Sequence, residues 1–269
     1  MKPYIYIVLL LSFISIGNAQ EFAADKALTT LETKKSSFQE GEWLKFRVHF
    51  GFINAGYATL KLKKTKKEGK LLYHAIGKGW TSGAARMFYK INDNYESYFT
   101  KDQIKPIRFK RRVNEDGYLI RRDLYFDHDL KQVTIEDFEK NTKKEVSIKD
   151  VQDLISAFYY LRDIDLSEIE EGDTLSVDLF FDGETYPFKL EFLEKDILNT
   201  KFGKIKTWRI LPLVQKGRVF EGQDSLTIWI SDDENKLPIR IKASLTVGSL
   251  KADLDEFRSL ANTFKVVAD

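Results

Sequence analysis

Residues 224–254 constrain the fold of this chain more than any other stretch, because three alternating strands and two turns can be read in them directly. Apolar side chains occupy every odd position of residues 239–247, and polar or basic side chains occupy every even position. This alternation is typical of a strand with one face in a core. Residues 226–230 alternate in the same way, and the polar run that follows them predicts a hairpin loop before Pro238.

The strand at residues 239–247 also fixes a register. A slip of one residue would turn its apolar face to water and bury Arg240 and Lys242. The change Ile241→Lys is therefore expected to cost several kcal/mol, whereas Lys242→Ile should change stability by about 1 kcal/mol or less. Gly248 breaks the alternation before residues 250–254 resume it, so a bulge, bend or turn is expected there.

Residues 1–19 have the pattern of a secretory signal peptide. A basic residue precedes an apolar run over residues 4–16, and the small residues Gly17 and Ala19 fit a cleavage site. The alternative, a membrane anchor, would need about 20 apolar residues. No Cys follows the run, which excludes lipid-anchored export. We therefore expect a mature protein that begins at Gln20, has no transmembrane segment and resides in the periplasm.

Charge and cysteine content exclude several classes of function. The chain has 43 Lys plus Arg and 41 Asp plus Glu, and this near-neutral balance gives no reason to expect a nucleic acid partner. It has no Cys, which excludes disulfides, Cys-ligated metals and thiol catalysis. Stability must then come from core burial, which a mature chain of about 250 residues, without residues 1–19, can supply.

Alternation and turn signals continue through most of the chain. Two β series, residues 41–150 and 172–256, flank a helical stretch at residues 151–163. They predict a mainly β fold, with a single β-rich domain over residues 41–256. In it about a dozen strands form a large curved antiparallel sheet or barrel-like meander with one main buried helix. The remaining segments are an N-terminal arm and a C-terminal tail, at residues 20–40 and 257–269.

Local signals place the hairpin turns. Asp116 with Gly117 is an expected turn pair, Asp182 and Gly183 end a later strand, and residues 54–56 are expected in the turn of the first hairpin. The basic run at residues 63–70 is interpreted as a solvated hairpin loop, with a polyanion site as the alternative. Ser82 is expected to cap a short helix over residues 83–91. Four apolar side chains of that helix would share one face: Ala84, Met87, Phe88 and Ile91.

Residues 153–162 form the strongest predicted helix. Their apolar side chains extend well beyond one helical stripe, so we expect burial on more than one side, inside the concave face of a curved sheet. Asp150 or Asp153 can cap the start, and Arg162 lies near the negative end of the helix dipole. We expect the space between helix and sheet to admit an apolar ligand. The alternative is an interior that side chains fill completely.

Three segments together resemble the domain-of-unknown-function 3108 family of exported Gram-negative bacterial proteins. They are residues 41–62 (GEWLKFRVHFGFINAGYATLKL), residues 153–162 (DLISAFYYLR), and residues 228–241 with 247–254 (IWISDDENKLPIRI and VGSLKADL). Leu154 follows the helix-opening Asp153, where the family usually has Pro. The resemblance implies a shared β fold. It carries over no functional residue, since the activity of the family is unassigned.

No catalytic or metal signature is present in the sequence. His49, His74 and His128 show no ligand spacing, so they are interpreted as ordinary histidines. Residues 232–235 (DDEN) could hold calcium, but they lack the alternate ligand spacing of a calcium loop and are better explained as a polar hairpin tip. Ser82 does not lie in a nucleophile-elbow pattern. We therefore assign no catalytic or metal-binding residue and expect no cofactor.

Three hypotheses of function follow. The first is a periplasmic carrier or sensor that binds a small apolar or amphipathic ligand. The second is a non-catalytic interaction or structural protein of the cell envelope, which docks a protein partner through a sheet edge or through a basic strand face. That face holds Arg108, Lys110 and Arg112, which could also attract an anionic head group. The third is a hydrolase assembled from distant carboxylates, which a cleft with strongly shifted acids would favour. An enzyme is the least favoured of the three.

Overall fold

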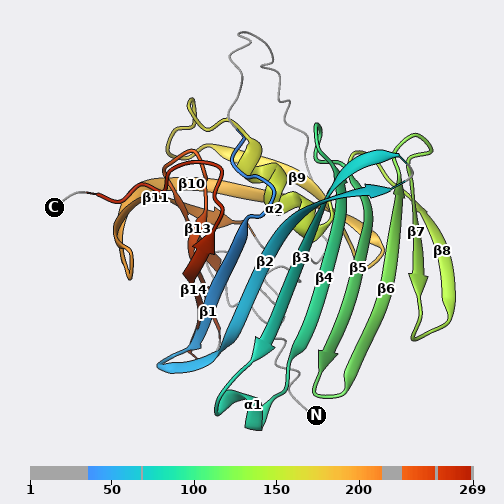
Figure 1. Ribbon diagram of the computed structural model, residues 1–269, viewed down its shortest axis with the longest axis horizontal. Helices are drawn as coiled ribbons and strands as arrows, with labels where there is room; N and C mark the ends of the chain where they lie inside the picture. The colour runs from blue at the N-terminus through green and yellow to red at the C-terminus, as the bar shows by residue number, and fades with distance from the viewer. Residues whose placement is uncertain (1–35, 68, 214–225, 246–247, 268–269) are drawn as a thin grey trace.

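The described part of the chain forms one curved antiparallel sheet of 14 strands with two helices (Figure 1). The computed structural model describes residues 36–67, 69–213, 226–245 and 248–267. The predicted signal peptide and most of the predicted arm lie outside these residues. A large curved antiparallel sheet with one main helix is therefore confirmed.

The first series contains β1 Trp43–Phe50, β2 Ile53–Lys67, β3 Lys70–Thr81, α1 Ala85–Phe88, β4 Asn92–Thr100, β5 Pro106–Glu115, β6 Tyr118–Asp127, β7 Gln132–Asp137 and β8 Thr142–Ser147. After α2 Leu154–Asp163, the second series contains β9 Thr174–Phe181, β10 Glu184–Thr200, β11 Gly203–Pro212, β12 Leu226–Ser231, β13 Pro238–Ser244 and β14 Ser249–Arg258.

The two β series join through their first and last strands. Within each series every strand pairs with the next one along the chain, and β1 pairs with β14 in a register that places Phe46 opposite Leu254. The edges of the described sheet are β8 and β9. Because a wide antiparallel sheet twists and curls, the two series wrap around a common interior that holds α2 (Figure 1).

The strand β13 has the orientation that its alternation predicts. Ile239 and Ala243 are buried and Ile241 is half-buried, whereas Lys242 is exposed. The expected turn at Gly248 is also present, because this residue has a φ of +81° and its carbonyl accepts a hydrogen bond from the Leu245 amide at 3.1 Å. The strand is shorter than predicted, since it ends at Ser244, and position 247 lies outside the described residues.

The predicted position of the first hairpin turn, at residues 54–56, is wrong. The turn lies at residues 51–52, where Gly51 has a φ of +57°, and residues 54–56 belong to β2. Gly56 serves a close backbone approach instead, because a Cβ there would lie 2.1 Å from the carbonyl oxygen of Trp80. The predicted loop at residues 63–70 is also wrong, since β2 continues to Lys67. The basic residues of this run are largely solvated as predicted, but they lie in a strand rather than in a loop.

The predicted helix over residues 83–91 is only the four-residue α1, and Ser82 does not cap it. Met87 and Phe88 are 84% and 86% exposed, while Ile91 leaves the helix and pairs with Glu115 as an isolated bridge. None of the four residues of α1 is buried, so the helical spacing of apolar residues produces no buried stripe here. The edge strand β8 follows β7, and its mostly exposed residues show no alternation that would predict a strand.

The main helix α2 begins and lies as predicted. The Asp153 side chain accepts hydrogen bonds from the amides of Ile155 and Ser156, and the Ser156 hydroxyl accepts one from the Asp153 amide, which completes a capping box. The helix contacts β3, β4 and β9, and its residues are buried on more than one side. No helix within the described residues is long and apolar enough to cross a membrane.

The end of the predicted arm belongs to the core. The ring of Phe38 packs against Tyr73 and Tyr159, with ring centroids 5.7 and 4.8 Å apart. At the other end of the chain, β14 continues two residues past the predicted boundary at 256, and Phe264 packs against Phe257 at 4.7 Å. Both chain ends described here therefore contribute apolar contacts.

Candidate functional site: an apolar cavity beside α2

A cavity of about 270 Å³ lies between α2 and the concave face of the sheet. The α2 residues that line it are Leu154, Ile155, Ala157, Phe158, Leu161 and Arg162, and both β series contribute apolar side chains such as Leu60, Val48, Phe192 and Ile228. The predicted space between helix and sheet is thus present. Its volume is just below the lower limit of about 300 Å³ for typical ligand pockets.

The small residues Ala58, Gly77 and Gly79 of β2 and β3 line the cavity. Ala58 is paired with Gly79, and Leu60 with Gly77, and all four line the cavity. A Cβ at Gly77 would already meet the Cδ1 atom of Ile155 at 3.4 Å. The sequence signal for this lining is the run of small residues at alternate positions of two neighbouring strands, Ala58 in one and Gly77 and Gly79 in the other.

The N-terminal end of α2 is fixed to both β series. The Ser97 hydroxyl on β4 donates to Asp153 at 2.5 Å, and burial raises the pKa of Asp153 to about 6. The segment before the helix forms a parallel bridge to β9, where the Gln152 amide donates to the Asp178 carbonyl at 2.8 Å. The lining that α2 provides is therefore held in place by hydrogen bonds.

The C-terminal end of α2 is fixed by the buried guanidinium of Arg162. Its Nη1 and Nη2 donate to the two carboxylate oxygens of Glu42 at 2.7 and 2.9 Å. Its Nε donates to the Asn235 carbonyl at 3.0 Å and Nη2 to the Ser37 carbonyl at 2.8 Å. Arg162 and Glu42 are 4% and 0% exposed. The sequence indicated only an interaction of Arg162 with the helix dipole and missed this ion pair.

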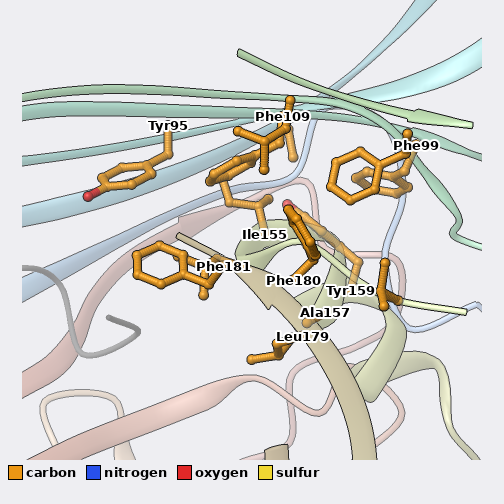
Figure 2. Close-up of a cluster of buried hydrophobic side chains, with 14 of the residues drawn as sticks. Tyr95, Phe99, Phe109, Ile155, Ala157, Tyr159, Leu179, Phe180 and Phe181 are labelled. Carbon is orange, nitrogen blue, oxygen red and sulfur yellow. The ribbon is translucent and has the colours of Figure 1, made fainter. Parts of the chain in front are cut away.

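A buried polar cluster, which includes Asp93, Glu115 and Arg111, lies near the part of the cavity that Tyr95 and Ile91 line. Asp93 and Glu115 are 1% and 2% exposed, and burial together with the Asp93 charge raises the pKa of Glu115 to about 7. Arg111 donates to Asp182 at 2.7 Å, which connects β5 to the β9–β10 turn. Tyr95 lines the cavity, and in Figure 2 its hydroxyl points away from Phe109.

The shifted acids of this cluster do not reach the cavity. Neither Asp93 nor Glu115 belongs to the cavity lining, so a molecule in the cavity would not meet their carboxyl groups. The cleft with shifted acids that would favour a hydrolase is therefore not formed by this cavity.

The aromatic cluster in Figure 2 separates α2 from the far wall of the sheet. Tyr159 from the helix packs between strands, with its ring 5.4 Å from Phe99 of β4, and Phe180 from β9 lies 6.1 Å from Phe126 of β6. Ring contacts of this kind contribute about 0.5–1.5 kcal/mol each beyond burial. They fill the interior on this side, so the cavity lining comes mainly from β1–β3, α2 and the second series.

The three histidines lie in separate environments. His74 contacts Glu96 at 2.9 Å, and His128 contacts the Pro106 carbonyl at 2.7 Å. His49 lies on β1, where partial burial lowers its pKa. No group of three metal-ligating side chains occurs among the described residues.

The acidic run at residues 232–235 shapes a hairpin tip. The Asp233 carboxylate accepts hydrogen bonds from Ser231 and from the amides of Asn235 and Lys236, at 2.7 to 3.2 Å. Ser82 lies in the loop before α1, where its amide donates to the Ala55 carbonyl. Neither feature has the arrangement of a metal or nucleophile site.

Two acidic side chains partly neutralise the basic strand face of β5. Arg108 and Arg112 both bind the buried carboxylate of Asp123, and Lys110 lies 3.4 Å from Glu96. Because these cations already have carboxylate partners, the face offers little attraction for an anionic head group.

Fold and cavity together define a curved antiparallel β-sheet protein with a helix against its concave face. The chain belongs to the family described as "Protein of unknown function (DUF3108)", whose model matches residues 45–255. This match confirms the resemblance found in the sequence. No curated protein matches the chain.

Two solved structures are similar to this chain. One is a "Beta-barrel-like Protein of Domain of Unknown Function DUF1849" from Brucella abortus, with a TM-score of 0.50 and 11% identity, covering 80% of this chain and 96% of that one. The other is a DUF1089 family protein from Pseudomonas aeruginosa, with a TM-score of 0.28 and 10% identity, covering 80% of this chain and 95% of that one. The first supports a shared β-barrel-like fold, and neither carries a function over.

Proposed function

We propose that this protein, after export to the periplasm, binds a small apolar or amphipathic molecule in the cavity beside α2. The observation that carries the proposal is the cavity of about 270 Å³ with its largely apolar lining. Water gains few hydrogen bonds in such a space, so an apolar guest is favoured. The volume suits a slender chain or one small ring system rather than a large ligand.

The way α2 is held supports a preformed site. Hydrogen bonds at Asp153 and the ion pair at Arg162 fix both ends of the helix. Binding in a preformed cavity avoids the entropy cost of ordering the lining. The two β series both contribute lining residues, so the site depends on the complete fold rather than on one hairpin.

Native mass spectrometry and lipid extraction of protein purified from the periplasm test the proposal. A Phe158→Trp variant places a fluorophore in the lining and should shift its emission when aminoanthracene or an extracted lipid is added. Intact-mass measurement of the same sample tests export, because cleavage before Gln20 removes residues 1–19. A retained Met1 would overturn the periplasmic assignment.

A matched pair of substitutions locates the binding. Leu60→Trp adds an indole over Gly77 inside the cavity, whereas Ile76→Trp adds the same ring to a half-buried side chain outside the lining. Aminoanthracene binding should fall at least about ten-fold in the first variant and stay unchanged in the second. Equal binding in both variants, with no extractable ligand, would overturn the carrier function.

The alternative function is a non-catalytic interaction protein of the cell envelope. Neither of its expected docking elements supports it strongly. The edge strand β8 is short and carries Lys143, Lys144 and Glu145, charges that oppose pairing with another strand. The basic face of β5 is already paired with Asp123 and Glu96. Support for docking comes instead from the loops at one end of the sheet.

A further inference from the structure

The connections between strands β1–β8 alternate between the two ends of the sheet, because neighbouring strands are antiparallel. The connections β1–β2, β3–β4, β5–β6 and β7–β8 therefore lie at the same end, at the bottom of Figure 1. We call this the apolar end and define it by residues 50–53, 82–91, 116–119 and 138–141.

Exposed apolar side chains concentrate at the apolar end. It holds eight of the twelve exposed large apolar side chains of the described residues: Phe50, Phe52, Ile53, Met87, Phe88, Tyr118, Leu119 and Phe138. Phe52 is fully exposed, and Phe88 is 86% exposed. The opposite end of these strands holds only Leu71 and Leu130 in the described part of the chain. Such a concentration on a soluble surface indicates a docking site.

The loops of the apolar end are tied to one another. The Ser82 amide donates to the Ala55 carbonyl at 3.1 Å, which joins the α1 loop to the start of β2. The Asp116 amide donates to the Lys90 carbonyl at 2.7 Å, which joins the α1 loop to the β5–β6 turn. The tips therefore form a connected platform rather than independent loops.

The charge of the α1 loop is positive. Residues 82–92 contain Arg86 and Lys90 and no Asp or Glu. Both cations are exposed and bracket the exposed side chains Met87 and Phe88. Apolar side chains flanked by cations match the two layers of a phospholipid surface, in which acyl chains lie beneath anionic phosphates.

The cavity continues toward this platform. Ala55, Trp80 and Ile91 line the cavity, and each lies within three residues of a connection at the apolar end.

We propose that the apolar end docks onto an anionic phospholipid surface, with Phe52 and Phe88 entering the interface and Arg86 and Lys90 contacting phosphates. A lipid surface fits better than a protein partner, because the exposed apolar side chains come from four tips of the platform. An interfacial layer adapts to such tips, whereas a protein partner needs a complementary shape. The proposal goes beyond ligand binding in the cavity and can hold without it.

Sedimentation with vesicles of phosphatidylethanolamine and phosphatidylglycerol tests the docking. The double change Phe52→Ser with Phe88→Ser should lower vesicle binding at least about ten-fold. The matched control, Leu71→Ser with Leu130→Ser, removes two exposed apolar side chains from the opposite end and should leave binding unchanged. Arg86→Gln with Lys90→Gln should lower binding several-fold at low salt, with the difference vanishing at high salt.

Three results would overturn the proposal. The first is unchanged vesicle binding in the Phe52/Phe88 variant, and the second is an equal loss of binding in the Leu71/Leu130 control. The third is a wild-type protein that does not bind vesicles but self-associates, with the self-association abolished only by the Phe52/Phe88 change. The last result would assign the apolar end to a second copy of this chain. Aminoanthracene binding, measured on the same variants, should not change. A lack of aminoanthracene binding in the wild-type protein and in all of these variants would therefore count against the cavity function and not against docking.

Discussion

Removing the charge of Arg162 should destabilise the fold more than any surface substitution. The variant Arg162→Met keeps most of the side-chain volume but leaves the Glu42 carboxylate, which is 0% exposed, without its bidentate partner. Breaking one side of a buried ion pair costs about 3–5 kcal/mol. The carbonyls of Ser37 and Asn235 also lose their donors, which adds to the cost.

A double-mutant cycle separates these contributions. Glu42→Leu alone should cost about 3–5 kcal/mol, because it leaves the guanidinium buried and uncompensated. The double variant removes both charges and leaves only the two carbonyls unsatisfied, so it should cost less than either single change. A double variant that costs less than either single variant is the signature of a buried pair in which each charge offsets the desolvation of the other.

Urea unfolding at neutral pH, followed by far-UV circular dichroism, gives the free energies. Lys143→Met is the control, because Lys143 is 63% exposed in its pair with Glu136 and such surface pairs contribute under about 1 kcal/mol. A cost for Arg162→Met as small as that of the control, or strict additivity of the two single changes at the Arg162–Glu42 pair, would refute the assignment of a buried ion pair.

Three further predictions concern α2, the glycines Gly56 and Gly77 that line the cavity, and β13. Burial raises the pKa of Asp153 to about 6 from 3.8, so the folded state binds its proton more tightly than the unfolded state. Asp153 therefore lowers the free energy of unfolding as pH rises from about 4 to about 6, by at most about 3 kcal/mol. Asp153→Asn should flatten that part of a pH series of urea melts, and an unchanged slope would contradict the shift. Gly56→Ala should cost about 1–3 kcal/mol in the same melts, because its Cβ would lie 2.1 Å from a backbone oxygen, whereas Gly77→Ala, with a nearest contact of 3.4 Å, should cost less than about 1 kcal/mol. Ile241→Lys should cost more than Lys242→Ile, but less than the sequence suggests, since Ile241 is only half-buried and lines the cavity, where a lysine stem can lie. Equal effects of these two changes would refute the assigned face of β13.

Local alternation in the sequence determined most of the strands, since the period of two in a strand is read from neighbouring residues alone. It predicted the strand faces of β13, the Asp116–Gly117 turn and the helix after Asp153, all of which the structure contains. The predictions were wrong where the local structure depended on contacts with another element of the fold. Gly56 suggested a turn but serves a close contact with β3, and the apolar spacing near Met87 suggested a buried helix face, whereas Met87 and Phe88 are exposed.

The candidate site depended on contacts distant in sequence. The sequence placed an apolar helix against a concave sheet, because side chains apolar on several sides must be buried. The pairing of β1 with β14, which brings the two β series around α2, cannot be read from either strand alone, since many strands could pair in the same pattern. The ion pair between Glu42 and Arg162 spans 120 residues, and only the tertiary structure brings those charges together. The cavity beside α2 has lining residues from both β series, so it forms only when the two series lie around the helix.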